Sequence, residues 1–178
     1  MRKILRTVIL FSFVFFSCAT IDRGNPEKIF ESHDSTQGVV YLSLPPNLAK
    51  KYIKTEFESN KEVKETLEEI EVMKALSIKK DEAEIDVDTE IVEPLKAYAL
   101  KEDMKELINV TNKNFHVSIQ ISESGEGKID ELLFMIDSKE NYTGVFLKGN
   151  ITLENILAII RHVDFNEIGN SFSFDIGI

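Results

Sequence analysis

Cys18 is the only cysteine in this chain of 178 residues, and its position is the clearest chemical signal in the sequence. It follows a basic start with Arg2, Lys3 and Arg6 and then an apolar run that ends at Phe16. A helix that spans a membrane needs about 20 apolar residues, so this run is too short to cross one. A basic start, a short apolar run and a small residue at the boundary are typical of a secretory signal, which we predict over residues 1–17.

The residues around this cysteine resemble the lipobox of bacterial lipoproteins. The resemblance implies cleavage before Cys18 and attachment of acyl chains such as palmitate to its thiol and to the new amino group. Ala19 follows instead of an aspartate, which by resemblance to known sorting patterns implies a lipid anchor in the outer membrane, facing the periplasm. An ordinary cleaved signal with an incidental cysteine, or an uncleaved anchor, are the alternatives. Residues 18–37 are mostly polar and are predicted to form a lipidated tether.

A second group of chemically suggestive residues is a run of alternating acids: Glu82, Glu84, Asp86, Asp88 and Glu90. In an extended chain they would share one face and could bind calcium, a hard cation that takes several oxygen ligands. The EF-hand pattern fails here, because Ile91 stands where that pattern needs a glycine and Ala97 where it needs a glutamate. A solvated acidic linker is the preferred interpretation.

The other candidate residues form no recognisable site. His33, His116 and His162 make no His-x-x-x-His pair, so shared metal binding lacks local support. Asp130 and Glu131 could form a carboxylate pair, but a solvated strand end explains them as well. The sequence holds no Gly-x-Ser-x-Gly elbow and no Gly-Lys-Ser/Thr loop. We therefore predict no catalytic residue, no cofactor and no metal ligand.

Composition narrows the class of protein. The chain is 43% hydrophobic and 29% charged, as in globular proteins. Its net charge of −10 argues against nucleic-acid binding, which needs clustered basic residues, and against adsorption to an anionic membrane by charge alone. A single cysteine excludes a disulfide within the chain.

Hydrophobic spacing predicts the elements that would position these residues. Alternating apolar residues predict strands over 39–44, 70–78, 115–121, 129–136 and 142–148. Helical spacing or a proline start predicts helices over 46–57, 94–101 and 153–163, with a short one within 58–69. Residues 104–111 could end a helix or begin a strand. Residues 122–128 are predicted to be a flexible loop, and Gly149-Asn150 to end the last strand.

The stretch from 128 to 163 is the predicted centre of the fold. Both alternating faces of 129–136 are apolar, which indicates a strand covered on both sides. The helix after Thr152 has a continuous apolar face and is predicted to cover the sheet. The expected fold is a single α+β domain over residues 38–165, mainly an antiparallel sheet with a C-terminal hairpin–helix unit and helices packed on one face. Residues 166–178 would be an edge strand, an exposed interaction strand or a disordered tail.

The lipobox, the strand Val39–Leu44, the middle strand Leu67–Ile78 and the segment IDELLFMIDSKENYTGVFLKGNITLENILAII resemble Bacteroidota lipoproteins that share the domain of unknown function four-two-five-two. The family's hairpin ends in a small turn before an apolar helix, and here that turn runs from Lys148 to Leu153. These motifs are structural, so the resemblance carries over no catalytic residues. Family members are often encoded near extracytoplasmic-function sigma factors, which implies a connection with the envelope or with signalling.

The sequence thus leads us to expect an envelope lipoprotein that acts as a binding or accessory module and is not an enzyme. Its expected partners are the lipid membrane, through acylated Cys18, and an envelope protein, with no nucleic acid. Two alternatives stay open. One is a regulatory component of envelope signalling, and the other is an enzyme with a carboxylate-based or metal-dependent site.

Overall fold

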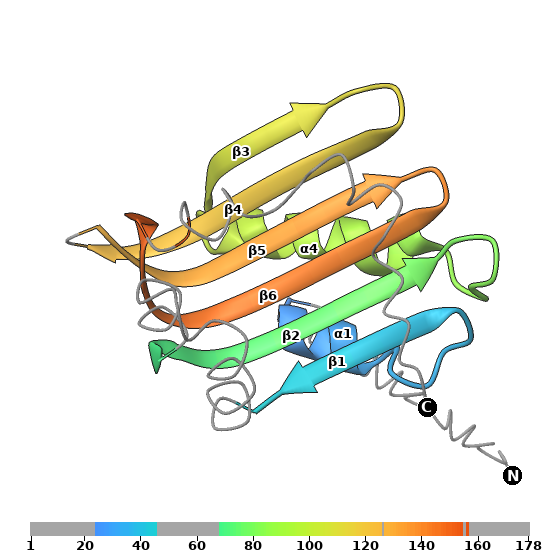
Figure 1. Cartoon of the computed structure of the whole chain (residues 1–178), viewed down its shortest axis with the longest axis horizontal. Helices are drawn as coiled ribbons and strands as arrows, with labels where there is room; N and C mark the ends of the chain where they lie inside the picture. Colours follow the sequence, from blue (N-terminus) through green and yellow to red (C-terminus); the bar gives the residue numbers. More distant parts are fainter. Residues whose placement is uncertain (1–23, 46–67, 126, 155, 157–178) are drawn as a thin grey trace, which may run out of the picture.

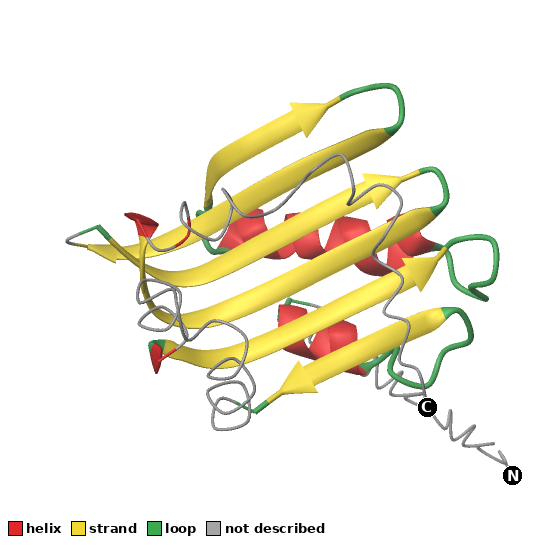
Figure 2. Ribbon diagram, in the orientation of Figure 1, coloured by secondary structure: helices red, strands yellow, loops and turns green. Residues whose placement is uncertain are grey.

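The computed structural model describes residues 24–45, 68–125, 127–154 and 156. Within these ranges an antiparallel sheet of six strands has the spatial order β1-β2-β6-β5-β4-β3 (Figure 1). The strands are β1 (Val39–Leu44), β2 (Ile70–Lys79), β3 (Lys105–Thr111), β4 (Phe115–Gly125), β5 (Lys128–Ser138) and β6 (Asn141–Thr152). The described helices are α1 (Pro26–Glu31), η1 (Asp88–Val92) and α4 (Glu93–Lys101). They lie behind the sheet in the view of Figures 1 and 2.

The predicted α+β class, with a mainly antiparallel sheet, is confirmed in this outline. All five predicted strands are present, and β5 lies inside the sheet as its two apolar faces indicated. The segment 104–111, which the sequence left open, begins with β3 at Lys105. Several other predictions fall outside the described residues: the signal peptide, Cys18, the helix over 46–57, most of the helix over 58–69, and residues 157–178.

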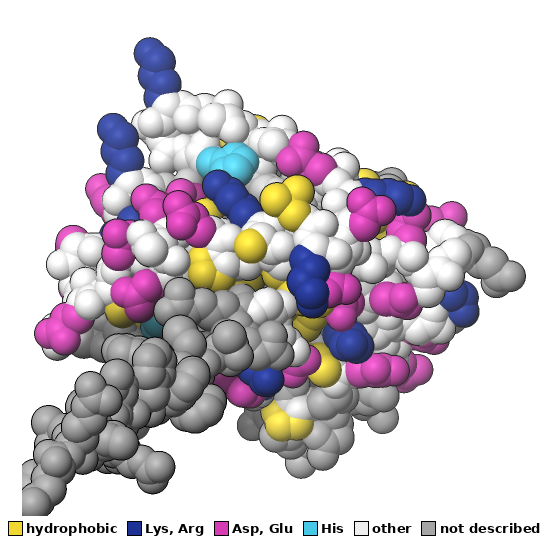
Figure 3. Space-filling model, turned by 180° about the vertical axis from the view of Figure 1, so that it is seen from behind, with side chains coloured by type: hydrophobic (Ala, Val, Ile, Leu, Met, Phe, Trp, Pro, Cys, Tyr) yellow, Lys and Arg dark blue, Asp and Glu magenta, His cyan; other side chains and the backbone are white. Residues whose placement is uncertain are grey.

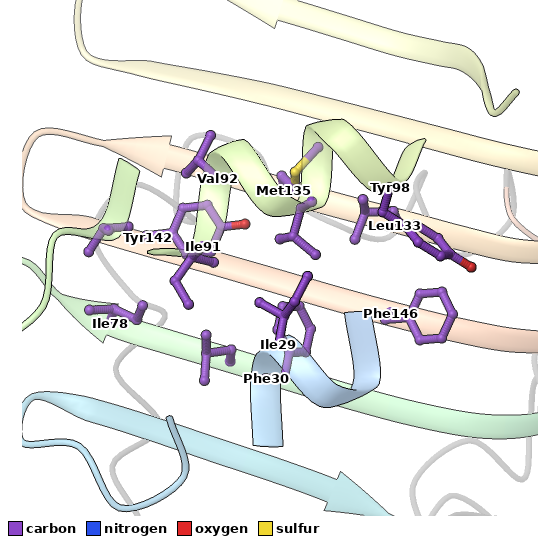
Figure 4. Packing of buried hydrophobic residues seen from close by; sticks show 13 residues of the cluster. Ile29, Phe30, Ile78, Ile91, Val92, Tyr98, Leu133, Met135, Tyr142 and Phe146 are labelled. Carbon is purple, nitrogen blue, oxygen red and sulfur yellow. The ribbon is translucent and has the colours of Figure 1, made fainter. Parts of the chain in front are cut away.

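The sheet has two apolar faces, and the described helices cover one of them. On that face lies a helix-side cluster that includes Phe30, Leu76, Ile91, Leu133 and Phe146. Figure 4 shows side chains of α1, η1 and α4 meeting those of β2, β5 and β6 in this cluster. The opposite face carries a second-face cluster that includes Ile119, Ile121, Leu132, Leu147, Ile151 and Ile156.

Bulges at one end of the sheet enlarge the second-face cluster. Side chains alternate between faces with a period of two, so Ile129 would share the face of Glu131 in a regular strand. A register shift between these two residues moves Ile129 to the other face, where it packs in the second-face cluster. A shift between Ile70 and Val72 on β2 does the same for Ile70. Apolar side chains therefore concentrate on the second face at this end.

Two predicted breaks in the sheet are wrong. β4 continues to Gly125 and β5 begins at Lys128, so most of the predicted loop over 122–128 is strand. β6 also runs through Gly149 to Thr152. A Cβ atom at Gly149 would lie 2.2 Å from the backbone oxygen of Glu69. The glycine is therefore needed where β2 approaches β6 closely, and it does not end the strand.

The prediction of a polar tether over 18–37 is wrong for residues 26–31, which form α1. Asn25 caps this helix by accepting a hydrogen bond from the Glu27 amide at 2.8 Å, and Pro26 occupies the first turn. Phe30 is 0% exposed, and its ring packs directly on Gly144 of β6, where an added Cβ would lie 2.8 Å from Phe30 Cζ. The folded domain therefore begins before residue 38.

Replacing Phe30 with alanine tests this correction. We expect Phe30→Ala to lower the free energy of unfolding by about 3–5 kcal/mol, because it leaves a cavity between α1 and the sheet. The measurement is urea denaturation of the full chain in a Cys18→Ser background. Leu100→Ala on α4 is the control, since Leu100 is 83% exposed and its loss should cost less than about 0.5 kcal/mol. Equal effects of the two substitutions would restore the tether interpretation.

Candidate binding surface

The residues that suggested chemistry do not gather in one place among the described residues. His33 lies in the turns that follow α1, and His116 lies on β4. Cys18 and His162 fall outside the described residues. Within the ranges that the structure describes, no group of three or more histidine, cysteine, aspartate or glutamate residues could hold a metal ion.

The acidic run from 82 to 90 is not an extended strand. Asp86 accepts hydrogen bonds from the backbone amides of Asp88 at 3.1 Å and Thr89 at 3.3 Å. Glu90 Oε1 in turn accepts from the Asp86 amide at 3.3 Å. The first amides of a helix have no partner within it, so this reciprocal arrangement caps the start of η1. Two of the five acids thus have a local structural role.

Asp130 and Glu131 were a candidate carboxylate pair, but Glu131 has other partners. Tyr98 of α4 donates a hydrogen bond to Glu131 Oε2 at 2.5 Å, and Lys148 of β6 donates to Oε1 at 3.3 Å. Burial first, and then the bond to Glu131, raise the pKa of Tyr98 well above its ordinary value. The ring of Tyr98 also meets Phe146 edge-on, with centroids 6.4 Å apart. Glu131 therefore holds α4 against the sheet through its hydrogen bond with Tyr98.

A second set of hydrogen-bonded polar side chains, Glu31, Tyr41 and Lys74, holds α1 against the sheet. Lys74 of β2 donates to Glu31 Oε1 at 2.5 Å and to the Tyr41 hydroxyl of β1 at 2.9 Å. The hydrogen bond from Lys74 lowers the pKa of Glu31. Burial lowers the pKa of Lys74, but the bonds to Glu31 and Tyr41 outweigh it and the net shift is upward. Sequence reasoning missed this group because it placed Glu31 in the tether.

The most accessible part of the sheet is its outer strand, β3. Five of its seven residues are exposed, whereas two of the six residues of the opposite outer strand, β1, are exposed. Val110 of β3 is 48% exposed, the largest value for a described strand residue among the exposed large hydrophobic side chains. An exposed outer strand presents backbone groups that can pair with another chain.

Hydrogen-bond alternation shows which backbone groups of β3 point outward. The Asn112 amide donates to the Phe115 carbonyl at 3.0 Å and closes the turn between β3 and β4. In an antiparallel pair, hydrogen-bonded and non-hydrogen-bonded residue pairs alternate. The backbone amide and carbonyl of Val110, which lies opposite Val117, therefore bond to β4. The amides and carbonyls of Asn109 and Thr111 point away from the sheet, where no described strand pairs with them.

The two faces of this edge differ in chemistry. The Asn109 side chain lies on the helix side. Its Nδ2 donates a hydrogen bond to Glu106 Oε2 at 2.8 Å, and its Oδ1 lies 3.1 Å from His116 Nε2. Because that oxygen only accepts, His116 donates through Nε2. Ile108 and Val110 lie on the second face. We call Ile108 to Thr111, with these side chains, the β3 edge.

Charge does not distinguish the helix-covered side of the molecule. Acidic and basic side chains are interspersed over the surface that Figure 3 shows. At the end of α4, Lys101 and Glu102 form an exposed ion pair at 2.9 Å, which contributes little to stability. A surface of mixed charge gives no electrostatic preference for a strongly charged partner. The β3 edge is therefore the better-defined candidate.

A family model described as a domain of unknown function (DUF4252) matches residues 33–159. The chain belongs to this family. The matched residues contain all six strands, both faces of the sheet and the β3 edge, whereas α1 precedes them. The family's description names no activity. No curated protein and no solved structure matches the chain. Of the helices that the structure describes, none has the length and apolar character needed to cross a membrane.

The Lys74–Glu31 pair generates a pH prediction. A carboxyl group whose pKa is lower in the folded state stabilises the fold above its unfolded pKa, and this stabilisation is lost as the pH falls through the folded pKa. We therefore expect the free energy of unfolding to decrease as the pH falls below the ordinary glutamate value of 4.5. The decrease should be shallower in Glu31→Gln. The effect is modest, because the Glu31 side chain is 52% exposed.

The measurement is urea denaturation between about pH 7 and pH 3, a range that brackets the ordinary carboxyl pKa values. Glu71→Gln is the control, since Glu71 is an exposed glutamate on the same strand as Lys74. Its pH profile should follow that of the unsubstituted chain. A Glu31→Gln profile that also follows it would show that the pair adds nothing to stability.

Proposed function

We propose that this chain is a lipoprotein of the bacterial cell envelope that binds another protein and catalyses no reaction itself. Acylated Cys18 holds it at the outer membrane, facing the periplasm. The signal-like start and the lipobox-like residues around Cys18 support the anchor. The resemblance to Bacteroidota lipoproteins supports a source in that group.

The observation that carries the binding function is the β3 edge. Its outward amides and carbonyls at Asn109 and Thr111 can pair with an extended segment of a partner, which would become a seventh strand next to β3. Main-chain hydrogen bonds of this kind supply affinity, and alternate side chains supply specificity. Lys105 and Glu106 place charges at one end of β3, which limits pairing there and leaves the other end as the preferred place for addition.

The two faces of the edge specify the partner's sequence. On the second face, the added strand would lie beside Ile108 and Val110, so apolar side chains are favoured there. On the helix side it would lie beside Asn109, where polar side chains are favoured. The fitting partner is therefore an extended segment in which apolar and polar residues alternate.

The anchor is tested by Cys18→Ser, which removes the thiol that would be acylated. We expect the unsubstituted protein to sediment with membranes and to incorporate radiolabelled palmitate when expressed in a Gram-negative host. The Cys18→Ser variant should incorporate no radiolabelled palmitate and should no longer sediment with the membranes. Ser17→Ala is the control and should retain the label. Equal labelling of the chain and the Cys18→Ser variant would remove the lipid anchor from the proposal.

The binding surface is tested by Val110→Lys, which places a charge on the β3 edge. Recovery of crosslinked envelope protein with the full-length lipoprotein should fall about tenfold, as expected for a loss near 1.4 kcal/mol. Val40→Lys is the matched control, since Val40 is a 38% exposed valine on β1 at the opposite edge. Recovery that falls equally for both variants, or no specific partner for the unsubstituted chain, would contradict binding at β3.

A further inference from the structure

Strand β3 has the chemistry of the segment that the β3 edge is expected to bind. That segment is extended, with apolar residues on the second face and polar residues on the helix side. In β3, Ile108 and Val110 lie on the second face, whereas Asn109 lies on the helix side and Thr111 shares that side. A second copy of the chain therefore carries a fitting segment. Because that segment is already extended, binding it costs little conformational entropy.

The outward backbone groups of β3 also complement those of a second β3. In an antiparallel pair, a residue that offers both its amide and its carbonyl lies opposite another residue that does the same. Asn109 and Thr111 are the outward residues of β3. If Val110 lies opposite its counterpart in the second copy, Asn109 falls opposite Thr111 at two symmetric places. The outward amides and carbonyls of these two residues then all have partners in both copies.

The regular part of β3 has the length that this register needs. A bulge between Glu106 and Ile108 interrupts the strand at one end, and the turn that begins with Asn112 ends it at the other. With Val110 at the centre, Ile108 lies opposite Asn112, so the pairing spans residues 108–112 and stops at both boundaries. Centring the pair on Thr111 instead would carry the pairing into the turn.

Charge disfavours the other neighbouring register, which is centred on Asn109. It would bring Lys105 of each copy opposite Lys113 of the other, and like charges directly opposite each other are destabilising. It would also bring the bulge residue Leu107 into the pairing. The register centred on Val110 avoids both of these costs.

We propose, building on the binding function above, that the partner of the β3 edge is a second copy of this chain. The two copies pair antiparallel through residues 108–112, about a two-fold axis at Val110. This axis is perpendicular to the sheet, so the two sheets become one and the helices of both copies lie on the same side. The two Val110 residues form a non-hydrogen-bonded pair on the second face, with Cα atoms about 4.5 Å apart.

Pairing of β3 with β1 of another copy is the alternative for a sheet that has two outer strands. It would leave an unpaired strand at each end and extend into an open filament, whereas a two-fold pair closes after two copies. β1 is also less accessible than β3, since two of its six residues are exposed. The two-fold pair of β3 edges is therefore favoured.

The lipid anchor makes such a small interface effective. A single pair of strands buries less than the roughly 1,200 Å² at which stable protein complexes begin, so association in solution is weak. Anchoring both copies in one membrane through Cys18 confines them to a surface and raises their effective concentration. The pairing is therefore expected in the membrane more than in dilute solution.

Introduced cysteines test the pairing in the full-length lipoprotein in membranes. Val110→Cys places each thiol beside its counterpart, within the Cα separation of about 4.4–6.8 Å that a disulfide allows. Mild oxidation should convert most of this variant to a disulfide-linked dimer. Val40→Cys is the matched control, because Val40 is an exposed valine on the opposite outer strand, and it should stay monomeric. The unsubstituted chain reports any dimer that forms through Cys18.

The register is tested with two differently tagged copies in the same membrane. Asn109→Cys in one copy and Thr111→Cys in the other should give a dimer that carries both tags, because these residues lie opposite each other. Asn109→Cys alone should give little dimer, since its counterpart lies diagonally, about 7–8 Å away. More dimer from Asn109→Cys alone than from the mixture would overturn the axis at Val110.

The remaining outcomes separate the second copy from the binding function on which it depends. Absence of Val110→Cys dimers, while Val110→Lys still lowers recovery of a different envelope protein, would overturn the second copy and retain binding at the β3 edge. Equal dimers from Val110→Cys and Val40→Cys would also overturn the two-fold pair. Absence of dimers together with no effect of Val110→Lys, in variants that keep a cooperative urea transition, would contradict both.

Discussion

The fold depends on a central pair of strands, β5 and β6, that carries apolar side chains on both faces. Leu133 and Phe146 point to the helix side, whereas Leu132 and Leu147 point to the second face. Such a pair cannot leave either face to solvent, because each large apolar side chain contributes on the order of 1.5–3 kcal/mol when buried. The helices cover one face, the bulges add apolar side chains to the other, and Ile156 is buried in the second-face cluster.

Polar residues fix the positions of α1 and α4 on the helix side of the sheet. Apolar contacts are not directional, so they hold a helix against a sheet without specifying its position well. Lys74 and Glu131 supply that direction, since each joins one helix to two neighbouring strands through hydrogen bonds with defined geometry. Glu131, which looked available for chemistry in the sequence, thus positions α4, and Lys74 does the same for α1.

The strands could be predicted from the sequence because alternation of apolar residues directly reflects the pleat of a strand. Helix α1 could not, because it has six residues and only Pro26, Ile29 and Phe30 are buried, too few to show a period. Its one local signal is Asn25-Pro26, a cap followed by a proline. Gly149 was misread for a related reason: its need for space comes from Glu69, a residue distant in sequence. The β3 edge was also beyond sequence reasoning, since an edge is defined only by which strands pair.

The strand order has a consequence for how the chain folds. Strands β3 to β6 follow one another and pair through short turns, so this half of the sheet closes small loops at low entropic cost. β2 pairs with β6 instead of β3, and joining Lys79 to Asn141 must close the whole intervening chain. Contacts so distant in sequence slow folding. Until β2 arrives, β6 is itself an unpaired edge, and the time it spends in that state sets how long the chain is exposed to aggregation.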